Sequence, residues 1–179
     1  MSSDRRSRTA TRTEEVDQPV VEQAPPWAAW TSVGLAALGL VLSVYLTFEH
    51  YSGNGSLACS DKGVVNCLKV TTSQWSSVLG IPVAVFGLVF FAVMIPMLLP
   101  RAWASQDTRL RWARLGLASV GMASVVYLVC VEAFAVRAIC LWCTAVHVVT
   151  FLLFSMVLVL TALTSPLTPP SKQELRRHR

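Results

Sequence analysis

Long apolar segments separated by short polar or charged ones dominate this chain. Four stretches contain no Asp, Glu, Lys or Arg: 23–48, 70–100, 115–131 and 138–171. A helix needs about 20 mostly apolar residues to cross the hydrocarbon core of a bilayer. The pattern therefore predicts four membrane helices, at roughly 30–48, 79–99, 115–134 and 139–163. The third is the least regular, because Glu132 lies near its end.

We therefore expect an all-α membrane protein. Its predicted fold is a four-transmembrane-helix bundle with a large extracytoplasmic loop, carrying a short interfacial helix, between helices 1 and 2. Residues 1–26 are expected to be a disordered cytoplasmic tail and 165–179 a second tail, with the membrane domain at 27–164 and the loop at 49–78. The first apolar run is not expected to be a signal peptide, since its leader is long and of mixed charge.

Positive charge indicates the orientation of this bundle. Lys and Arg gather in both tails and in the loop at 101–114, whereas the opposite side holds only Lys62, Lys69 and Arg137. The positive-inside rule places the tails and the 101–114 loop in the cytoplasm of a multi-pass plasma-membrane protein. The segments at 49–78 and 137–143 then face outward. No nucleic-acid partner is expected, because the basic residues have no folded face behind them.

The cysteines are the candidate chemistry. Cys140 and Cys143 form a CxxC pair at the mouth of the fourth helix, where the helix N-terminus favours a thiolate, the species that attacks in disulfide exchange. So small a ring is a poor structural crosslink. Cys59 and Cys67 lie in the outer loop and form either a structural disulfide or a mobile dithiol that exchanges with the CxxC pair. Cys130, inside the third run, is expected to be buried as a small apolar residue.

A metal site is not expected from these cysteines. Zinc sites built from cysteine are usually two closely spaced knuckles, whereas seven residues separate Cys59 from Cys67. An oxidising compartment also disfavours thiolate ligands, because disulfides persist there.

Four further residues are candidates for binding a quinone. His147 follows the CxxC pair on one helical stripe and either donates a hydrogen bond to a quinone carbonyl or bonds a neighbouring helix. Ser73 is expected to cap a short helix and Trp75 to anchor it at the membrane surface, unless this segment forms a lid over the CxxC pair. Phe86 either stacks on the quinone ring or faces the core or the lipid.

Taken together, these residues resemble the vitamin K epoxide reductase family. The match is an ordered set: Cys59-x7-Cys67, Ser73 and Trp75, Leu-Gly-Ile-Pro at 79–82 with Ala84 and Gly87, and Cys140-x2-Cys143. The resemblance implies a four-helix bundle around a quinone. It also implies that Cys143 faces the quinone, that Cys140 exchanges with Cys67, that Cys59 meets an outside partner, and that the Ser73 hydroxyl lies near the exchanging disulfide.

The chain departs from the animal enzymes at two positions. His147 stands where they have a tyrosine, and Val83 where they have an asparagine that bonds the quinone. These departures favour the simple quinone reduction of bacterial members over epoxide reduction. Many bacterial members also carry a fused thioredoxin-like domain, and this chain ends at 179 without one. The resemblance then implies a separate periplasmic thioredoxin-fold partner that is DsbA-like.

The function expected from the sequence is a membrane thiol:quinone oxidoreductase that generates disulfides, using menaquinone or ubiquinone. A DsbB-type oxidase would carry its CxxC in the first outer loop, so the cysteine order argues against it. The alternative from another class is a non-catalytic membrane scaffold with a structural loop disulfide. An exporter of reductant would need cysteines reachable from both faces of the membrane, and the cytoplasmic segments contain none.

Overall fold

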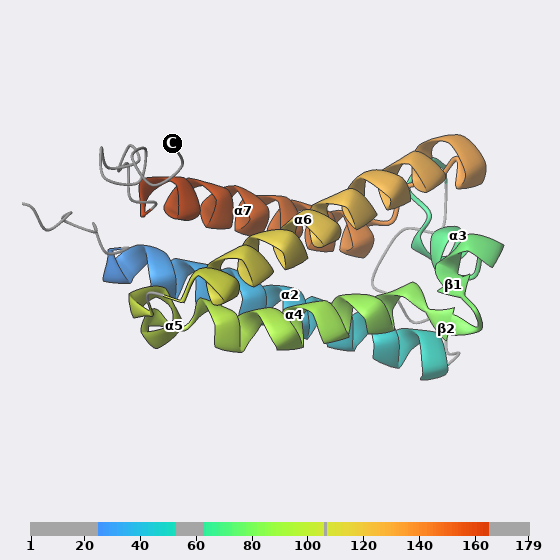
Figure 1. Ribbon diagram of the computed structural model, residues 1–179. Helices are drawn as coiled ribbons and strands as arrows, with labels where there is room; N and C mark the ends of the chain where they lie inside the picture. The colour runs from blue at the N-terminus through green and yellow to red at the C-terminus, as the bar shows by residue number, and fades with distance from the viewer. Residues whose placement is uncertain (1–24, 53–62, 106, 165–179) are drawn as a thin grey trace, which may run out of the picture.

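The structure, a computed structural model, describes residues 25–52, 63–105 and 107–164. Four long helices form an elongated bundle (Figure 1): α2 (Pro26–Ser52), α4 (Val83–Leu98), α6 (Thr108–Cys130) and α7 (Leu141–Leu163). Helix α2 packs against both α4 and α7, and α6 packs against α7. The last turn of α6 continues as a short π-helix, η2 (Val131–Val136).

The shorter elements lie at the two ends of the bundle. The beginning of α2, the end of α7 and the short helix α5 (Pro100–Ala104) share one end (Figure 1). The other end carries α3 (Cys67–Thr71), the 3₁₀ turn η1 (Gln74–Ser76) and a small hairpin of β1 (Ser77–Val78) and β2 (Ile81–Pro82). The CxxC pair lies toward this second end, where η2 leads into α7.

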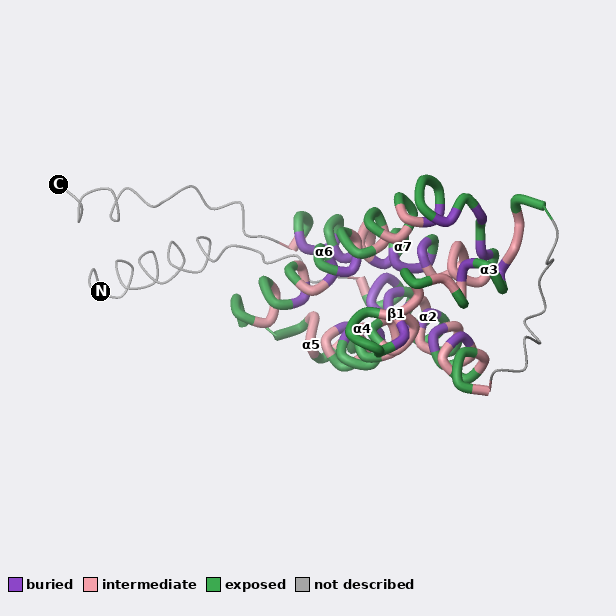
Figure 2. Tube along the Cα trace, turned by 90° about the vertical axis from the view of Figure 1, so that its right-hand side faces the viewer, coloured by how far each residue is buried: buried purple, intermediate pink, exposed green. Residues whose placement is uncertain are grey.

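The outer surface of the helices is strongly apolar. Val41 on α2, Val120 on α6 and Phe151 on α7 are 65%, 62% and 51% exposed, and buried positions lie where the helices face one another (Figure 2). Among the described residues, three segments are long and apolar enough to cross a membrane: α2, α6 with η2, and α7. Helix α4 is apolar but has only 16 residues. Apolar faces of this extent are typical of a multi-pass membrane protein.

The core of the bundle lies between α2, α4 and α7. Phe91, Met94 and Leu98 of α4 and Leu153 and Val157 of α7 are all fully buried there. The Phe91 ring lies directly against Gly39 of α2, where a Cβ atom would overlap it. Glycine at 39 therefore lets α2 and α4 approach closely.

Two helices begin later than the sequence pattern predicts. The second was expected from Leu79, but Ser77 pairs with Pro82 and Val78 with Ile81 in the hairpin, so α4 begins at Val83. Leu79 and Gly80 form the turn with positive φ of 54° and 80°, a backbone region incompatible with a continuous right-handed helix. The fourth was expected from Ile139 and begins at Leu141.

The other two helices are longer than predicted. The first apolar helix begins at Pro26, inside the segment expected to be disordered, and ends at Ser52. The third begins at Thr108, because the Asp107 carboxylate accepts a hydrogen bond from the Arg109 backbone N–H at 2.8 Å. Such a cap satisfies a helix donor that otherwise has no partner.

Two expectations about single residues were wrong. Ser73 is the N-cap of η1 by position, but its side chain makes no cap: its hydroxyl donates to the Val70 carbonyl at 2.8 Å. The side-chain cap nearby is that of α3, where Asn66 accepts from the Lys69 N–H at 2.8 Å. Cys130 is exposed rather than buried. It lies at the end of α6 on an outward-facing surface, which in a membrane protein can contact lipid instead of a core.

Candidate active site

A short backbone bridge joins the two segments that carry the cysteines. Val65 and Ile139 form a parallel β-bridge. The Asn66 N–H donates to the Ile139 carbonyl at 3.0 Å, and the Ile139 N–H donates to the Val64 carbonyl at 2.8 Å. Cys67 follows Val65 by two residues and Cys140 follows Ile139 by one. The bridge therefore holds the two cysteine-bearing segments side by side.

Cys67 and Cys140 share one buried cluster. They are 1% and 0% exposed and pack with Val70, Val136 and Ala138. Cys67 is disulfide-bonded, whereas Cys140 and Cys143 are free thiols. Its expected partner, Cys59, lies outside the described residues. The arrangement places a disulfide sulfur and a free thiol in the same apolar environment.

Cys140 is the N-cap of α7, not a residue within it. Its backbone is extended, with φ −99° and ψ 117°, and its sulfur accepts a hydrogen bond from the Cys143 N–H at 3.3 Å. A hydrogen bond from the Cys143 side chain also lowers the pKa of the Cys140 thiol below its ordinary value, outweighing burial, which raises it. The thiolate is the attacking species in disulfide exchange, and this geometry favours the thiolate form of Cys140.

The turn before Cys140 has an unusual backbone. Arg137 ends η2 in the left-handed region, at φ 54° and ψ 43°, and its N–H donates to the Glu132 carbonyl. The Ala138 N–H donates to the same carbonyl at 3.3 Å. Both π-turns and left-handed non-glycine residues are uncommon and concentrate at functional sites. Here they turn the chain from the end of α6 toward the start of α7.

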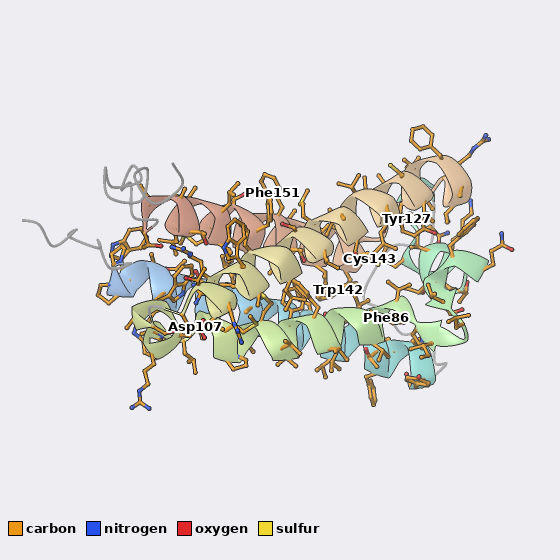
Figure 3. All side chains as sticks on the ribbon, viewed as in Figure 1. Phe86, Asp107, Tyr127, Trp142, Cys143 and Phe151 are labelled. Carbon is orange, nitrogen blue, oxygen red and sulfur yellow. The ribbon has the colours of Figure 1, made fainter. Side chains whose placement is uncertain are left out.

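A cavity of about 420 Å³ opens beside Cys143. Its wall includes all four residues predicted to bind a quinone: Ser73, Trp75, Phe86 and His147. Figure 3 shows Phe86 and Cys143 in the half of the bundle far from Asp107. The structure thus brings together a thiol, a buried imidazole and two aromatic rings that come from separate parts of the chain.

The cavity has the composition expected of a site for a flat, lipid-soluble molecule. Most of its wall is apolar, and its polar groups include those of Cys143, His147 and Ser73. Sites for small organic ligands commonly have volumes of about 300–1,000 Å³ and a small number of placed polar groups. A quinone headgroup, a ring with two carbonyl acceptors, fits this size and chemistry.

Sequence reasoning did not identify Glu132 as a site residue. It lines the same cavity, and the residue is only 8% exposed. It accepts a hydrogen bond from the Cys140 backbone N–H. The signal was available, because a lone carboxylate at the end of an apolar run is a candidate functional group.

Comparison with known families gives the site its context. A sequence model of the vitamin K epoxide reductase family matches residues 30–158, more than half of the chain. This chain belongs to that family. Membership indicates a membrane disulfide oxidoreductase, and it agrees with the three apolar helices that are long enough to cross a membrane. Within the family, the matched region runs from α2 into α7 and includes every predicted cysteine and cavity residue.

Proposed function

We propose that the protein is a thiol:quinone oxidoreductase that generates disulfides. Electrons would enter from a periplasmic DsbA-like thioredoxin-fold protein, pass through Cys59 and Cys67 to Cys140 and Cys143, and reach a quinone. The observation that carries the proposal is the shared burial of Cys67 and Cys140, with Cys143 facing a cavity that also holds His147.

The first exchange takes place at the loop pair. A thiolate of the partner attacks the Cys59–Cys67 disulfide at Cys59, and the partner leaves with a new disulfide while both loop cysteines become thiols. This step needs Cys59 to meet the partner. Two electrons have then entered the loop pair.

The second exchange uses the buried cluster. The Cys67 thiolate attacks Cys140 of the Cys140–Cys143 disulfide and releases Cys143, which takes up the proton that the Cys59 thiol gives up. The Cys59 thiolate then attacks Cys67, which re-forms the loop disulfide and releases Cys140. The N-cap position stabilises Cys140 as the leaving thiolate, because it receives the Cys143 N–H. The free Cys140 and Cys143 beside an oxidised Cys67 correspond to the state after this step.

The cavity residues act in the last step. A bound quinone supplies a two-electron acceptor. His147 would donate a hydrogen bond to one of its carbonyls, while Phe86 and Trp75 would hold the ring and Ser73 would border it near the cysteines. The two sulfurs together give up two electrons as the Cys140–Cys143 disulfide forms again.

We also propose that α4 is the fourth membrane span. Its 16 residues extend about 24 Å at the helical rise per residue. It runs beside α2 from the hairpin end of the bundle to the α5 end (Figure 1), so it crosses with α2. Arg101, Arg109 and Arg111 lie at the α5 end (Figure 1). By the positive-inside rule this charge supports a topology with both termini in the cytoplasm and the cysteines outside.

The test is a series of single substitutions read by the partner's redox state. In cells, Cys59→Ala, Cys140→Ser and Cys143→Ser are each expected to leave the partner reduced, as measured by thiol alkylation. A partner variant without its second cysteine should be captured as a mixed disulfide on Cys59. A membrane scaffold predicts an unchanged partner in all three variants, and that result would exclude the proposed function.

A further inference from the structure

Glu132 is the one buried carboxyl among the described residues, and neither the two exchanges nor the quinone step above uses it. It lies in the π-helix η2, and the residue is 8% exposed. A buried carboxylate costs free energy unless it is paired or neutralised, and such groups are retained mainly at functional sites. Its position therefore needs an explanation.

Two contacts connect Glu132 to the CxxC pair. The carboxyl accepts a hydrogen bond from the Cys140 N–H, the residue that caps α7. It also interacts electrostatically with the sulfurs of both Cys140 and Cys143. These contacts come from different elements, since Glu132 belongs to the end of α6 and the cysteines to the start of α7.

A third observation connects Glu132 to the quinone. Glu132, Cys143 and His147 line the same cavity. A proton that left the Cys143 thiol could therefore reach a ligand in this cavity through one carboxyl group. The apolar wall offers few other groups that exchange protons.

The ionisable groups around Glu132 can be named from each element packed near it. They are Cys140, the N-cap of α7, Cys143 and His147 of α7, and His50 of α2, which also lines the cavity. Lys69 of α3 and Arg137 at the end of η2 have exposed side chains. The two sulfurs are thus the groups whose protons Glu132 is placed to take.

We propose that Glu132 is the proton carrier of the CxxC pair: it takes the proton of the Cys143 thiol and delivers it to the quinone oxygen. This inference rests on the proposed function. In the complete step the sulfurs lose two electrons and form one S–S bond, and the quinone gains two electrons and two protons. One proton comes from Cys143 through Glu132. The other comes from water, because Cys140 has already released its proton as a thiolate.

The test compares Glu132→Gln with Glu49→Gln, the same substitution at the end of α2, outside the cavity wall. Purified protein receives a reduced thioredoxin-fold dithiol and a short-chain ubiquinone, and quinol formation is followed by absorbance. General acid–base catalysis contributes about 10²–10⁴-fold, so Glu132→Gln should lower turnover by at least about 100-fold. Glu49→Gln should stay within about twofold of the unmodified protein.

A second measurement, without quinone, separates proton transfer from a structural role. The Glu132 carboxylate disfavours a thiolate at Cys140. Removing its charge should therefore speed alkylation of Cys140 by iodoacetamide at neutral pH, even though turnover falls. A variant that merely perturbs the fold would not combine faster thiolate formation with slower turnover. Glu132→Asp, which keeps the carboxyl, should recover turnover to within about tenfold of the unmodified protein.

The turnover and alkylation measurements distinguish a proton carrier from a structural residue. If the unmodified protein reduces quinone and Glu132→Gln does so at a similar rate, the proton-carrier role is wrong and the proposed function stands. If turnover falls but Cys140 alkylation slows as well, or Glu132→Asp is as inactive as Glu132→Gln, the residue is structural. If the unmodified protein reduces no quinone, both proposals fail.

Discussion

Replacing Cys143 with alanine is expected to trap a disulfide between Cys67 and Cys140. In the structure Cys67 is oxidised and Cys140 is a free thiol in the same buried cluster. The Cys140 thiolate can attack Cys67 and release Cys59. Without Cys143, no second thiol of the CxxC pair is present to resolve the new bond. Alkylating the released Cys59 thiol should then make the product permanent.

The hydrogen bonds of the backbone bridge allow the yield of the Cys67–Cys140 crosslink to be estimated. Two hydrogen bonds, at 3.0 and 2.8 Å, hold the Cys67 segment against Ile139. A net contribution of about 1 kcal/mol for each gives about 2 kcal/mol in favour of the docked segment. That corresponds to a ratio of about 30 to 1. Most molecules should therefore hold Cys67 beside Cys140, and the crosslink should form in the majority of them.

The assay is peptide mapping by mass spectrometry under non-reducing conditions. All proteins carry Cys130→Ala, so that the exposed fifth cysteine cannot take part. The matched control is Cys140→Ser, which keeps Cys143 one helical turn deeper, and it should give little bond between Cys67 and Cys143. The reasoning is refuted if Cys143→Ala shows no joined peptide, or if the control crosslinks equally well.

Two other predictions concern acidity and packing. Hydrogen bonds from Cys143 lower the pKa of Cys140, so Cys143→Ala should raise this pKa, and the thiolate absorbance of Cys140 should appear at higher pH. The titration is made in a protein that lacks the other three cysteines, so that only Cys140 contributes to the absorbance. An unchanged midpoint of this titration would contradict the assignment. Gly39→Ala should destabilise the bundle by about 1–3 kcal/mol, because the new Cβ would overlap the buried Phe91 ring. The matched variant is Gly34→Ala, whose added Cβ would have no atom within 4 Å, and its unfolding temperature in detergent should be unchanged or slightly raised. If Gly39→Ala and Gly34→Ala lower the unfolding temperature equally, the close approach of α2 and α4 at Gly39 is not what determines stability.

The helical architecture could be predicted because it depends on length and polarity alone. The charge-free runs at 23–48, 115–131 and 138–171 each contain most of one long apolar helix of the structure. The exact ends could not be predicted, because local backbone chemistry sets them. The hairpin at 77–82 needs positive φ at Leu79, a residue that gives no sign of it in the sequence.

The sequence indicated which residues belong to the candidate cysteine site, but not how they are arranged. Spacing and resemblance identified Cys67, Cys140 and Cys143, and also four residues that line the cavity. The sequence did not show that Cys140 is an N-cap, because that depends on the π-turn and the left-handed Arg137 before it. It also did not show that Val65 pairs with Ile139, since a β-bridge between distant segments has no local signature.

Quinone reduction by the purified protein tests the account most directly. A reduced thioredoxin-fold dithiol and a quinone are mixed with the protein, and quinol and partner disulfide are counted together. The account predicts one quinol for each partner disulfide, a loss of at least about 100-fold for Cys67→Ala and for Cys140→Ser, and full activity for Cys130→Ala. Substantial turnover in the protein that lacks Cys67 would contradict the transfer of electrons from the loop pair to the CxxC pair.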